Sequence, residues 1–398
     1  MISLALIASM TLTAAIRVDE RPMTDSKTIA VVATVTSGGT GVELDSRWRV
    51  LSRSLLGGSR SYTRRQLYEY GSQAGPVPDV VVGEGFMQVR MEVPAGKSGL
   101  SLASDFLFEF LTQPTLREED IAQARHELAM EVPSAWSRLP FVEASVTPES
   151  VRALHRATFK PSSVRFAVVG GFGTGEAAFE FNRRFGAWTG TRAGVVPIGK
   201  PTAAVTRPDQ NSVFRWETRT PVTSAAACAR GLLVACSLGA GKDASLFRIV
   251  RQQHRWGYEQ AAGWRANGSD WSLTAVTVQP SQAEASKVAE AMRAEVAKDI
   301  ERWDASTLER AKQVALACLA GRFPMNPIGI GTDTRFGSGL MSEASLVGIS
   351  ALHGRPFGRA EVGSALGLVD LAEIQADAKR LLASPVTIQA GRPPVRAE

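Results

Sequence analysis

The 398-residue sequence predicts a two-domain protein of mixed helices and strands. Three observations indicate this architecture. Apolar, β-branched segments typical of buried strands recur along the whole chain, and amphipathic segments typical of helices follow them. The order of these elements in the first half returns coarsely in the second, which suggests an internal duplication. A Gly-, Pro- and Thr-rich segment without periodicity, residues 191–210, is typical of an interdomain linker and separates the halves.

The first half begins with an apolar, β-branched run that predicts a buried strand over residues 27–39. Residues 79–93 predict a pair of strands, and residues 163–171 predict another strand. Segments with helical periodicity lie between and after these strands. The expected helices are residues 47–59, 61–75, 98–115, 117–132, 148–159 and 175–188.

The second half is expected to contain strands over residues 213–220, 224–238, 269–280 and 385–390. The segment 224–238 is assigned to a strand because it is apolar throughout. Residues 243–260 predict a helix with Asp243 as its N-cap. The remaining helices are expected over residues 282–303, 305–323 and 371–384.

Composition excludes several classes of function. The 44% hydrophobic and 21% charged content is ordinary for a globular protein. The net charge of +6 is spread along the chain without a dense basic run, so we expect no nucleic-acid partner. Cys228, Cys236 and Cys318 match neither a zinc nor a redox spacing, and their apolar surroundings predict buried free thiols.

Residues 1–15 are almost wholly apolar and end in small residues, which is typical of a secretory signal peptide. This interpretation favours export to the periplasm or cell envelope over the cytoplasm. The alternative is a leading strand. The segment is too short to span a bilayer as a helix, and no other stretch reaches that length without charges, so we expect no integral membrane segment.

The helix predicted over residues 47–59 carries Arg49 and Arg53 one turn apart on the same face and ends at a glycine pair. This region, residues 35–59, is similar to the zinc-helix region of the M16 peptidase family, the insulinase and mitochondrial-processing-peptidase group. Further segments resemble that family in the same order. They are residues 61–75, 110–128, 154–172 and 246–260.

The resemblance implies an α+β fold of the LuxS/MPP-like metallohydrolase type. Two homologous domains, residues 16–190 and 211–398, would each consist of a mainly antiparallel sheet covered by helices. They would face each other across a chamber. The resemblance also implies a reaction, which is the zinc-dependent hydrolysis of peptides.

The zinc-binding residues of the family are missing from this sequence. The family's H-x-x-E-H motif aligns with residues 49–53 of this sequence. Arg49 and Arg53 stand in place of the histidines, and Ser52 stands in place of the glutamate. A guanidinium stays protonated and offers no lone pair to a metal, and a serine cannot replace a carboxylate base. Glu127 and Glu131 lie near the position of the family's third ligand, where we expect a solvated helix face. We therefore expect no metal and no other cofactor.

Two interpretations of Arg49 and Arg53 remain open. The arginines form a cationic helix face that is solvated or salt-bridged, or they form a site for an anion, a carboxylate or a partner subunit. The four histidines are spread along the sequence, and none lies four residues from another. We interpret each as a surface or core histidine.

In the family's C-terminal half, an arginine and a tyrosine seven residues apart contact the substrate beside the zinc. Arg251 and Tyr258 have that spacing here. Seven residues are close to two helical turns, so both side chains can project from one helical face. The resemblance implies that this pair binds peptide. The alternative is an ordinary amphipathic helix with an exposed arginine.

The resemblance therefore favours a non-catalytic M16-type subunit that binds peptide and pairs with a zinc-bearing M16 chain as a heterodimer. A stand-alone scaffold or assembly protein with the same fold is the alternative. An autonomous peptidase with a displaced metal site is disfavoured by the residues themselves.

Overall fold

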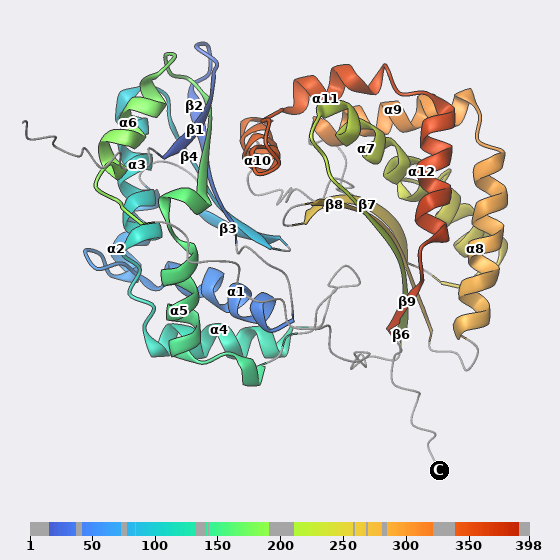
Figure 1. Cartoon of the computed structure of the whole chain (residues 1–398), viewed down its shortest axis with the longest axis horizontal. Helices are drawn as coiled ribbons and strands as arrows, with labels where there is room; N and C mark the ends of the chain where they lie inside the picture. The colour runs from blue at the N-terminus through green and yellow to red at the C-terminus, as the bar shows by residue number, and fades with distance from the viewer. Residues whose placement is uncertain are drawn as a thin grey trace, which may run out of the picture.

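The computed structural model describes residues 16–36, 42–72, 78–83, 85–131, 141, 143–190, 211–257, 259–267, 270–280, 285–320 and 339–389. These residues form two sheets, each covered by helices on its outer side, and the two sheets face the middle of the molecule (Figure 1). The expected α+β fold with two sheet-and-helix halves is thereby confirmed. The apolar leader, residues 1–15, and the expected linker, residues 191–210, lie outside the described residues.

The first sheet contains five strands in the order β1-β5-β2-β4-β3. Only β1 and β5 run parallel, and the other neighbours are antiparallel. The central strand β2, with the sequence TIAVVATVT, is buried on both faces, as its β-branched composition predicts. The strand bounds are β1 Arg17–Pro22, β2 Thr28–Thr36, β3 Asp79–Gly83, β4 Phe86–Pro94 and β5 Val164–Gly170.

The described residues of the first half contain six α-helices beside the first sheet, and all six overlap helices that the sequence predicts. They bury one apolar face each, as α3 does with Phe106 and Phe110, whose rings stack 5.7 Å apart. A short turn of tighter helix, Leu55–Gly57, follows α1 and stops at Gly58, whose φ of 132° favours glycine. The bounds are α1 Val42–Ser54, α2 Arg64–Ser72, α3 Lys97–Thr112, α4 Glu118–Met130, α5 Pro148–Thr158 and α6 Glu176–Phe185.

The second sheet contains four antiparallel strands in the order β7-β8-β6-β9. Trp216 on β6 and Trp264 and Trp271 on β7 and β8 enter one core with the helices behind the sheet. The bounds of the strands are β6 Asn211–Thr220, β7 Glu259–Asn267, β8 Asp270–Pro280 and β9 Thr387–Gln389. The helices of this half are α7 Ala225–Gly239, α8 Ala285–Glu301, α9 Ala305–Leu319, α10 Gly339–Ala351, α11 Arg359–Leu366 and α12 Leu371–Ala383.

Two expectations for the second half are wrong. The apolar segment 224–238 is the helix α7 and not a strand, because Ser224 caps its first turn and the run is long, rich in alanine and buried on nearly all sides. The helix expected over residues 243–260 is shorter. It ends as a π-helix, Phe247–Gln253, and Arg255 then adopts a positive φ of 52°. Strand β7, which the sequence did not reveal, begins at Glu259.

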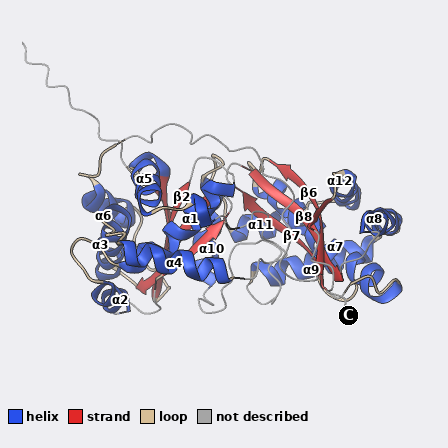
Figure 2. Cartoon of the chain, turned by 90° about the horizontal axis from the view of Figure 1, so that it is seen from below, coloured by secondary structure: helices blue, strands red, loops and turns tan. Residues whose placement is uncertain are grey.

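Helix α10 belongs to the second half of the chain but lies against the first sheet (Figures 1 and 2). Met341, Ala344 and Val347 pack on β2 and β5. Leu346 and Ile349 belong to the core of the second half. The two halves are therefore joined by one buried helix as well as by the chain between them.

Candidate functional site

The site that the sequence singles out lies where α1 packs on α4. The apolar face of α1 packs in the core of the first half through Leu44, Trp48 and Leu51, and Leu55 in the following turn packs in the same core. The adjacent face carries Arg49 and Arg53, which are one helical turn apart and half-buried. These two arginines occupy the positions at which the family resemblance places histidines.

Helix α4 presents two carboxylates to these arginines. Its apolar residues Ile121, Ala124 and Leu128 are buried, and the neighbouring face carries Glu127 and Glu131 one turn apart. Glu131 stands at the C-terminal end of the helix, where the helix dipole disfavours a negative charge. A cationic partner at this position therefore stabilises the helix end.

The four side chains form an ion cluster. Arg49 Nη2 lies 3.3 Å from Glu131 Oε2, and Arg53 Nη1 lies 3.3 Å from Glu127 Oε2. Arg53 also donates a short hydrogen bond to Glu131. We call Arg49, Arg53, Glu127 and Glu131 the α1–α4 ion cluster. Two positive charges meet two negative charges, so its formal charges cancel.

Ser52 and Phe141 also lie beside the α1–α4 ion cluster, and neither can activate water for hydrolysis. Ser52 is buried, and its Oγ donates to the carbonyl of Arg49 at 2.8 Å, within the same helix. The guanidinium of Arg49 lies 5.8 Å from the centre of the Phe141 ring, in the range of a cation–π contact. Neither contact provides a proton acceptor poised to activate water.

The contacts decide between the two interpretations of Arg49 and Arg53. Both guanidiniums are engaged by carboxylates, so the salt-bridged interpretation matches the structure and the anion-site interpretation does not. Glu127 and Glu131 are likewise not merely a solvated face, because each contacts an arginine. Sequence reasoning missed this pairing, although the matched spacing of four residues on two helices is the signal that reveals it.

Zinc, which the family resemblance brings to mind, does not fit these residues. Arginine has no lone pair for a metal, and its charge repels one. Within the described residues, no group of three or more His, Cys, Asp or Glu side chains is arranged to hold a metal ion.

The structure describes only one residue, Arg251, of the second candidate site. Arg251 is exposed on the π-helix Phe247–Gln253, and its guanidinium lies 5.2 Å from the centre of the Phe247 ring. Tyr258 lies outside the described residues. The helix ends five residues before Tyr258, and residues 254–257 are not helical, so the expectation of one shared helical face is wrong.

Of the four histidines, His155 has the most distinct environment. Its ring stacks on Phe159 at 4.4 Å between centroids, and its Nε2 lies 3.0 Å from the carbonyl oxygen of Leu111. Burial lowers the pKa of His155 to about 4, and the contact with Leu111 opposes this shift. His155 is thus a partly buried, neutral histidine of α5.

No helix in the described part of the chain has both the length and the apolar character needed to cross a membrane.

Fold and site define a class of protein. It has two α+β halves with helices outside their sheets, and its α1 carries arginines where zinc-binding histidines would stand. Residues 145–314 match the family model of the peptidase M16 inactive domain. The predicted resemblance to the M16 peptidase family is confirmed by this match and by the fold, and the H-x-x-E-H zinc motif of that family is missing from this sequence.

Solved structures share the fold over nearly the whole chain. A protease from Helicobacter pylori has a TM-score of 0.71 at 11% sequence identity, covering 96% of this chain and 98% of that chain. A peptidase M16 inactive domain from Pseudomonas fluorescens has a TM-score of 0.69 at 13% identity, covering 97% of this chain and 98% of that chain.

The periplasmic protease PqqL from Escherichia coli has a TM-score of 0.61 at 14% identity, covering 95% of this chain but only 46% of that chain. This chain thus spans about half the length of that protease. At these identities the likeness is one of fold. A comparison with the curated proteins found no match.

Proposed function

We propose that this protein is the non-catalytic, peptide-binding subunit of a heterodimeric M16-type peptidase, whose partner chain carries the zinc. The observation that carries the proposal is the α1–α4 ion cluster. The helix face that would hold a metal and its activating base is filled by two arginines neutralised by two glutamates. Hydrolysis in such an assembly therefore depends on a second chain.

The length of PqqL supports pairing. The match covers 95% of this chain and 46% of the PqqL chain. Two chains of this size therefore match the length of that one chain. The periplasmic location named for PqqL also agrees with the export that the apolar leader of this sequence predicts.

The first sheet offers a surface for peptide. β3, with the sequence DVVVG, stands at the end of the strand order, and among the described strands it pairs only with β4. It also contacts α1, the helix of the ion cluster. An extended peptide can add to such an edge through backbone hydrogen bonds. Arg251, and Tyr258 with it, would hold the peptide from the second half, because a guanidinium binds a carbonyl or carboxylate strongly.

The test is reconstitution with a zinc-bearing M16 chain from the same organism. We expect the two chains to co-elute in size-exclusion chromatography and to cleave an unstructured peptide only together. Arg251→Ala should weaken peptide binding, and Tyr258→Phe should lower turnover on the order of 10²-fold, the typical cost of losing one preorganised donor. Arg65→Ala, at an exposed position of α2, is the control.

Three results would contradict the proposal. Failure of the chains to associate would favour the scaffold alternative. Association with turnover unchanged in both variants would show that the seven-residue spacing is a coincidence. Chelator-sensitive hydrolysis by this chain alone, with one zinc bound per chain, would instead show an autonomous peptidase.

A further inference from the structure

Two cysteines from different helices meet in the second half of the chain. Cys236 lies in the last turn of α7, and Cys318 lies in the last turn of α9. Their side chains hydrogen-bond to each other, although β7, β8 and α8 lie between them in the sequence. Both are buried thiols in the structure, as their apolar surroundings predict. The fold thus brings together two sulfur atoms whose spacing in the sequence matches no known motif.

The packing of α7 on α9 produces this contact. The buried face of α9 carries small side chains, among them Ala311 and Ala315, and small side chains let two helices approach closely. The same two helices are also joined by a polar contact. Arg310 of α9 donates through Nη1 to the carbonyl of Ala240, which directly follows α7, at 3.2 Å. The two thiols therefore meet in a helix pair that is held by both apolar and polar contacts.

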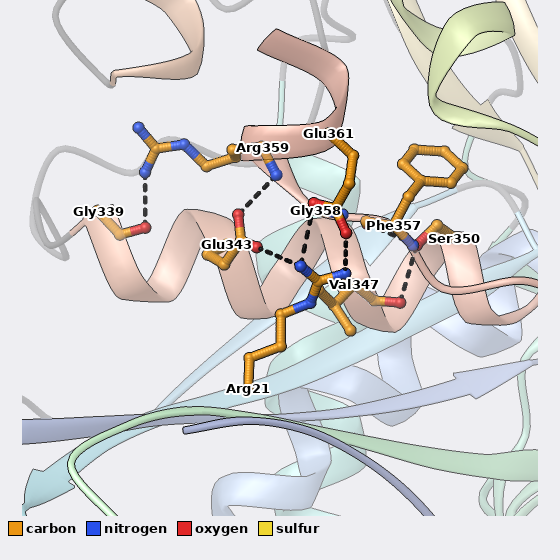
Figure 3. A network of polar contacts seen from close by, with 9 residues as sticks. All are labelled: Arg21, Gly339, Glu343, Val347, Ser350, Phe357, Gly358, Arg359 and Glu361. Atoms are coloured by element: carbon orange, nitrogen blue, oxygen red, sulfur yellow. Dashed lines mark hydrogen bonds and ion pairs between the residues drawn. The ribbon is translucent and has the colours of Figure 1, made fainter. Parts of the chain in front are cut away.

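Helix α11 contacts both α7 and α9, and polar contacts anchor its first turn. Glu343 of α10 accepts a hydrogen bond from the backbone nitrogen of Arg359 at 2.6 Å (Figure 3). Glu361 accepts one from the backbone nitrogen of Gly358 at 3.1 Å, and two more from Arg21 of β1 at 3.0 and 2.6 Å. The helix pair that carries the two cysteines thus packs against an anchored third helix.

Cys228, the third cysteine of the chain, has different surroundings. It lies on α7 just over two helical turns before Cys236, about 12 Å along the helix axis, which is farther than the Cα separation that a disulfide spans. Its thiol hydrogen-bonds with Trp264 of β7 instead. Burial raises the pKa of Cys228 to about 12, and the contact with Trp264 opposes this shift. Cys228 is therefore a single buried thiol and an internal control for the other two.

We propose that Cys236 and Cys318 form a disulfide between α7 and α9 when the chain folds in an oxidising compartment. The two thiols are already in contact, and a bond requires their sulfurs to approach to about 2 Å. Both lie at helix ends, where the backbone adjusts more readily than in the middle of a helix. The export that the apolar leader predicts would bring the chain into such a compartment. This disulfide does not depend on the peptidase assembly proposed above.

The oxidant is an external disulfide, either of a small molecule or of a thiol oxidoreductase. One cysteine attacks this disulfide as a thiolate, forms a mixed disulfide and releases one external thiol. The other cysteine then attacks the protein sulfur of the mixed disulfide and releases the second external thiol. One S–S bond thus replaces two S–H bonds in the protein. The two electrons and the two protons pass to the external disulfide, which leaves as two thiols.

This exchange takes place on the folding chain and not on the finished fold. The hydrogen bond with Cys318 raises the pKa of Cys236, and burial raises it further. A thiol that stays protonated is a poor nucleophile, so the folded pair reacts slowly. Before α9 packs on α7, both thiols are open to the oxidant. The packing of the two helices then brings the sulfurs together and shields the bond from reduction.

Production of the full chain in two bacterial hosts, one with a reducing and one with an oxidising cytoplasm, tests the proposal. Each sample is denatured in an alkylating reagent without reductant and analysed by mass spectrometry. From the reducing host we expect three alkylated cysteines. From the oxidising host we expect alkylation of Cys228 alone and a pair of peptides linked through Cys236 and Cys318. The linked chain should melt about 5 °C above the same chain after reduction, because the bond constrains the unfolded state.

Two variants make the test specific. In Cys318→Ser from the oxidising host, both remaining cysteines should be alkylated, and reduction should leave the melting temperature unchanged. Cys228→Ser is the matched control and should keep both the link and the difference in melting temperature. Three alkylated cysteines in the unmodified chain from both hosts would overturn the proposal, and so would a link that uses Cys228.

Discussion

At the scale of the residue, four charged side chains link α1 to α4 at the positions where the family resemblance would place a metal site. Metal ligands often hold two elements together, and here two arginines and two glutamates make the contact between α1 and α4. The pairs are half-exposed, so each is worth little alone. Their contribution to stability comes from the network of contacts, in which Arg53 contacts both Glu127 and Glu131.

The first prediction concerns this network. Arg53→Ala should lower the free energy of unfolding by about 1 kcal/mol, because it leaves Glu127 and Glu131 side by side at a helix end. Arg49→Ala should cost less, because Arg49 contacts only Glu131 among the four. Chemical denaturation measures both. In the double variant Arg53→Ala/Glu131→Ala the loss should be smaller than the sum of the single losses. Strict additivity would show that the cluster contributes no coupling.

The second prediction concerns His155. Its pKa is about 4 in the folded chain, against about 6.5 for an unperturbed histidine. The unfolded chain therefore binds this proton more readily. The stability contributed by neutral His155 is fully present above about pH 6.5 and is lost as the pH falls towards 4, a loss on the order of 2 kcal/mol.

Denaturation midpoints measured from pH 7 to pH 4 check this expectation. His155→Gln should flatten the part of the pH dependence that lies between 6.5 and 4. His126→Gln, on the exposed face of α4, is the control because it removes a histidine that lies outside the core. A variant at residue 155 with the same profile as the unmodified chain would contradict the assignment.

At the scale of the element, α10 shows how small residues allow close packing. A Cβ at Gly348 would lie 2.5 Å from Thr34 Oγ1 on β2, so the helix can approach the sheet only with glycine there. Gln88 Nε2 on β4 donates to the carbonyl of Ser345 at 2.9 Å, which fixes the helix along the sheet. A polar bond and a close approach thus define one position for α10.

The third prediction follows from this packing. Gly348→Ala should destabilise the protein by about 1–3 kcal/mol, the usual cost of overpacking, because the buried hydroxyl of Thr34 has little room to move. Gly363→Ala on α11 is the matched control. Its new Cβ would have only Leu316 nearby, at 4.0 Å, so better helix propensity should stabilise it by about 0.5–1 kcal/mol. Thermal unfolding of both variants gives the comparison. Equal shifts in the same direction would contradict the close approach.

At the scale of the whole molecule, the two halves are connected in two ways. The chain passes from one to the other at residues 191–210, and α10 packs between their cores. The second connection buries apolar surface, so it stabilises the contact between the halves independently of the chain between them. Cutting the first should leave the second intact.

The fourth prediction is that limited proteolysis cuts first within residues 191–210 and that the two fragments stay together. Polar, Gly- and Pro-rich connections are preferred sites of nicking. We expect both fragments to co-elute in size-exclusion chromatography at the position of the uncut chain and to separate only in denaturant. Separate elution in native buffer would show that α10 does not hold the halves together.

The sequence by itself determined the class of fold. Periodicity located all six helices of the first half and strands β2 to β5, because each of these elements carries its own apolar pattern. The same reasoning failed for α7, because a buried helix and a buried strand both have a continuous apolar sequence without a distinguishing period. The absence of the H-x-x-E-H motif was also readable, because Arg49, Ser52 and Arg53 stand at its positions.

Only the tertiary structure decided what these residues contact. The partners of Arg49 and Arg53 lie 74 to 82 positions further along the chain, and Glu361 lies 340 positions from Arg21. No local sequence pattern encodes these long-range ion pairs, since they depend on which helices pack against each other in the folded chain. The placement of α10 on the sheet of the other half is decided in the same way, because an apolar helix face does not specify by its local sequence which sheet it packs against.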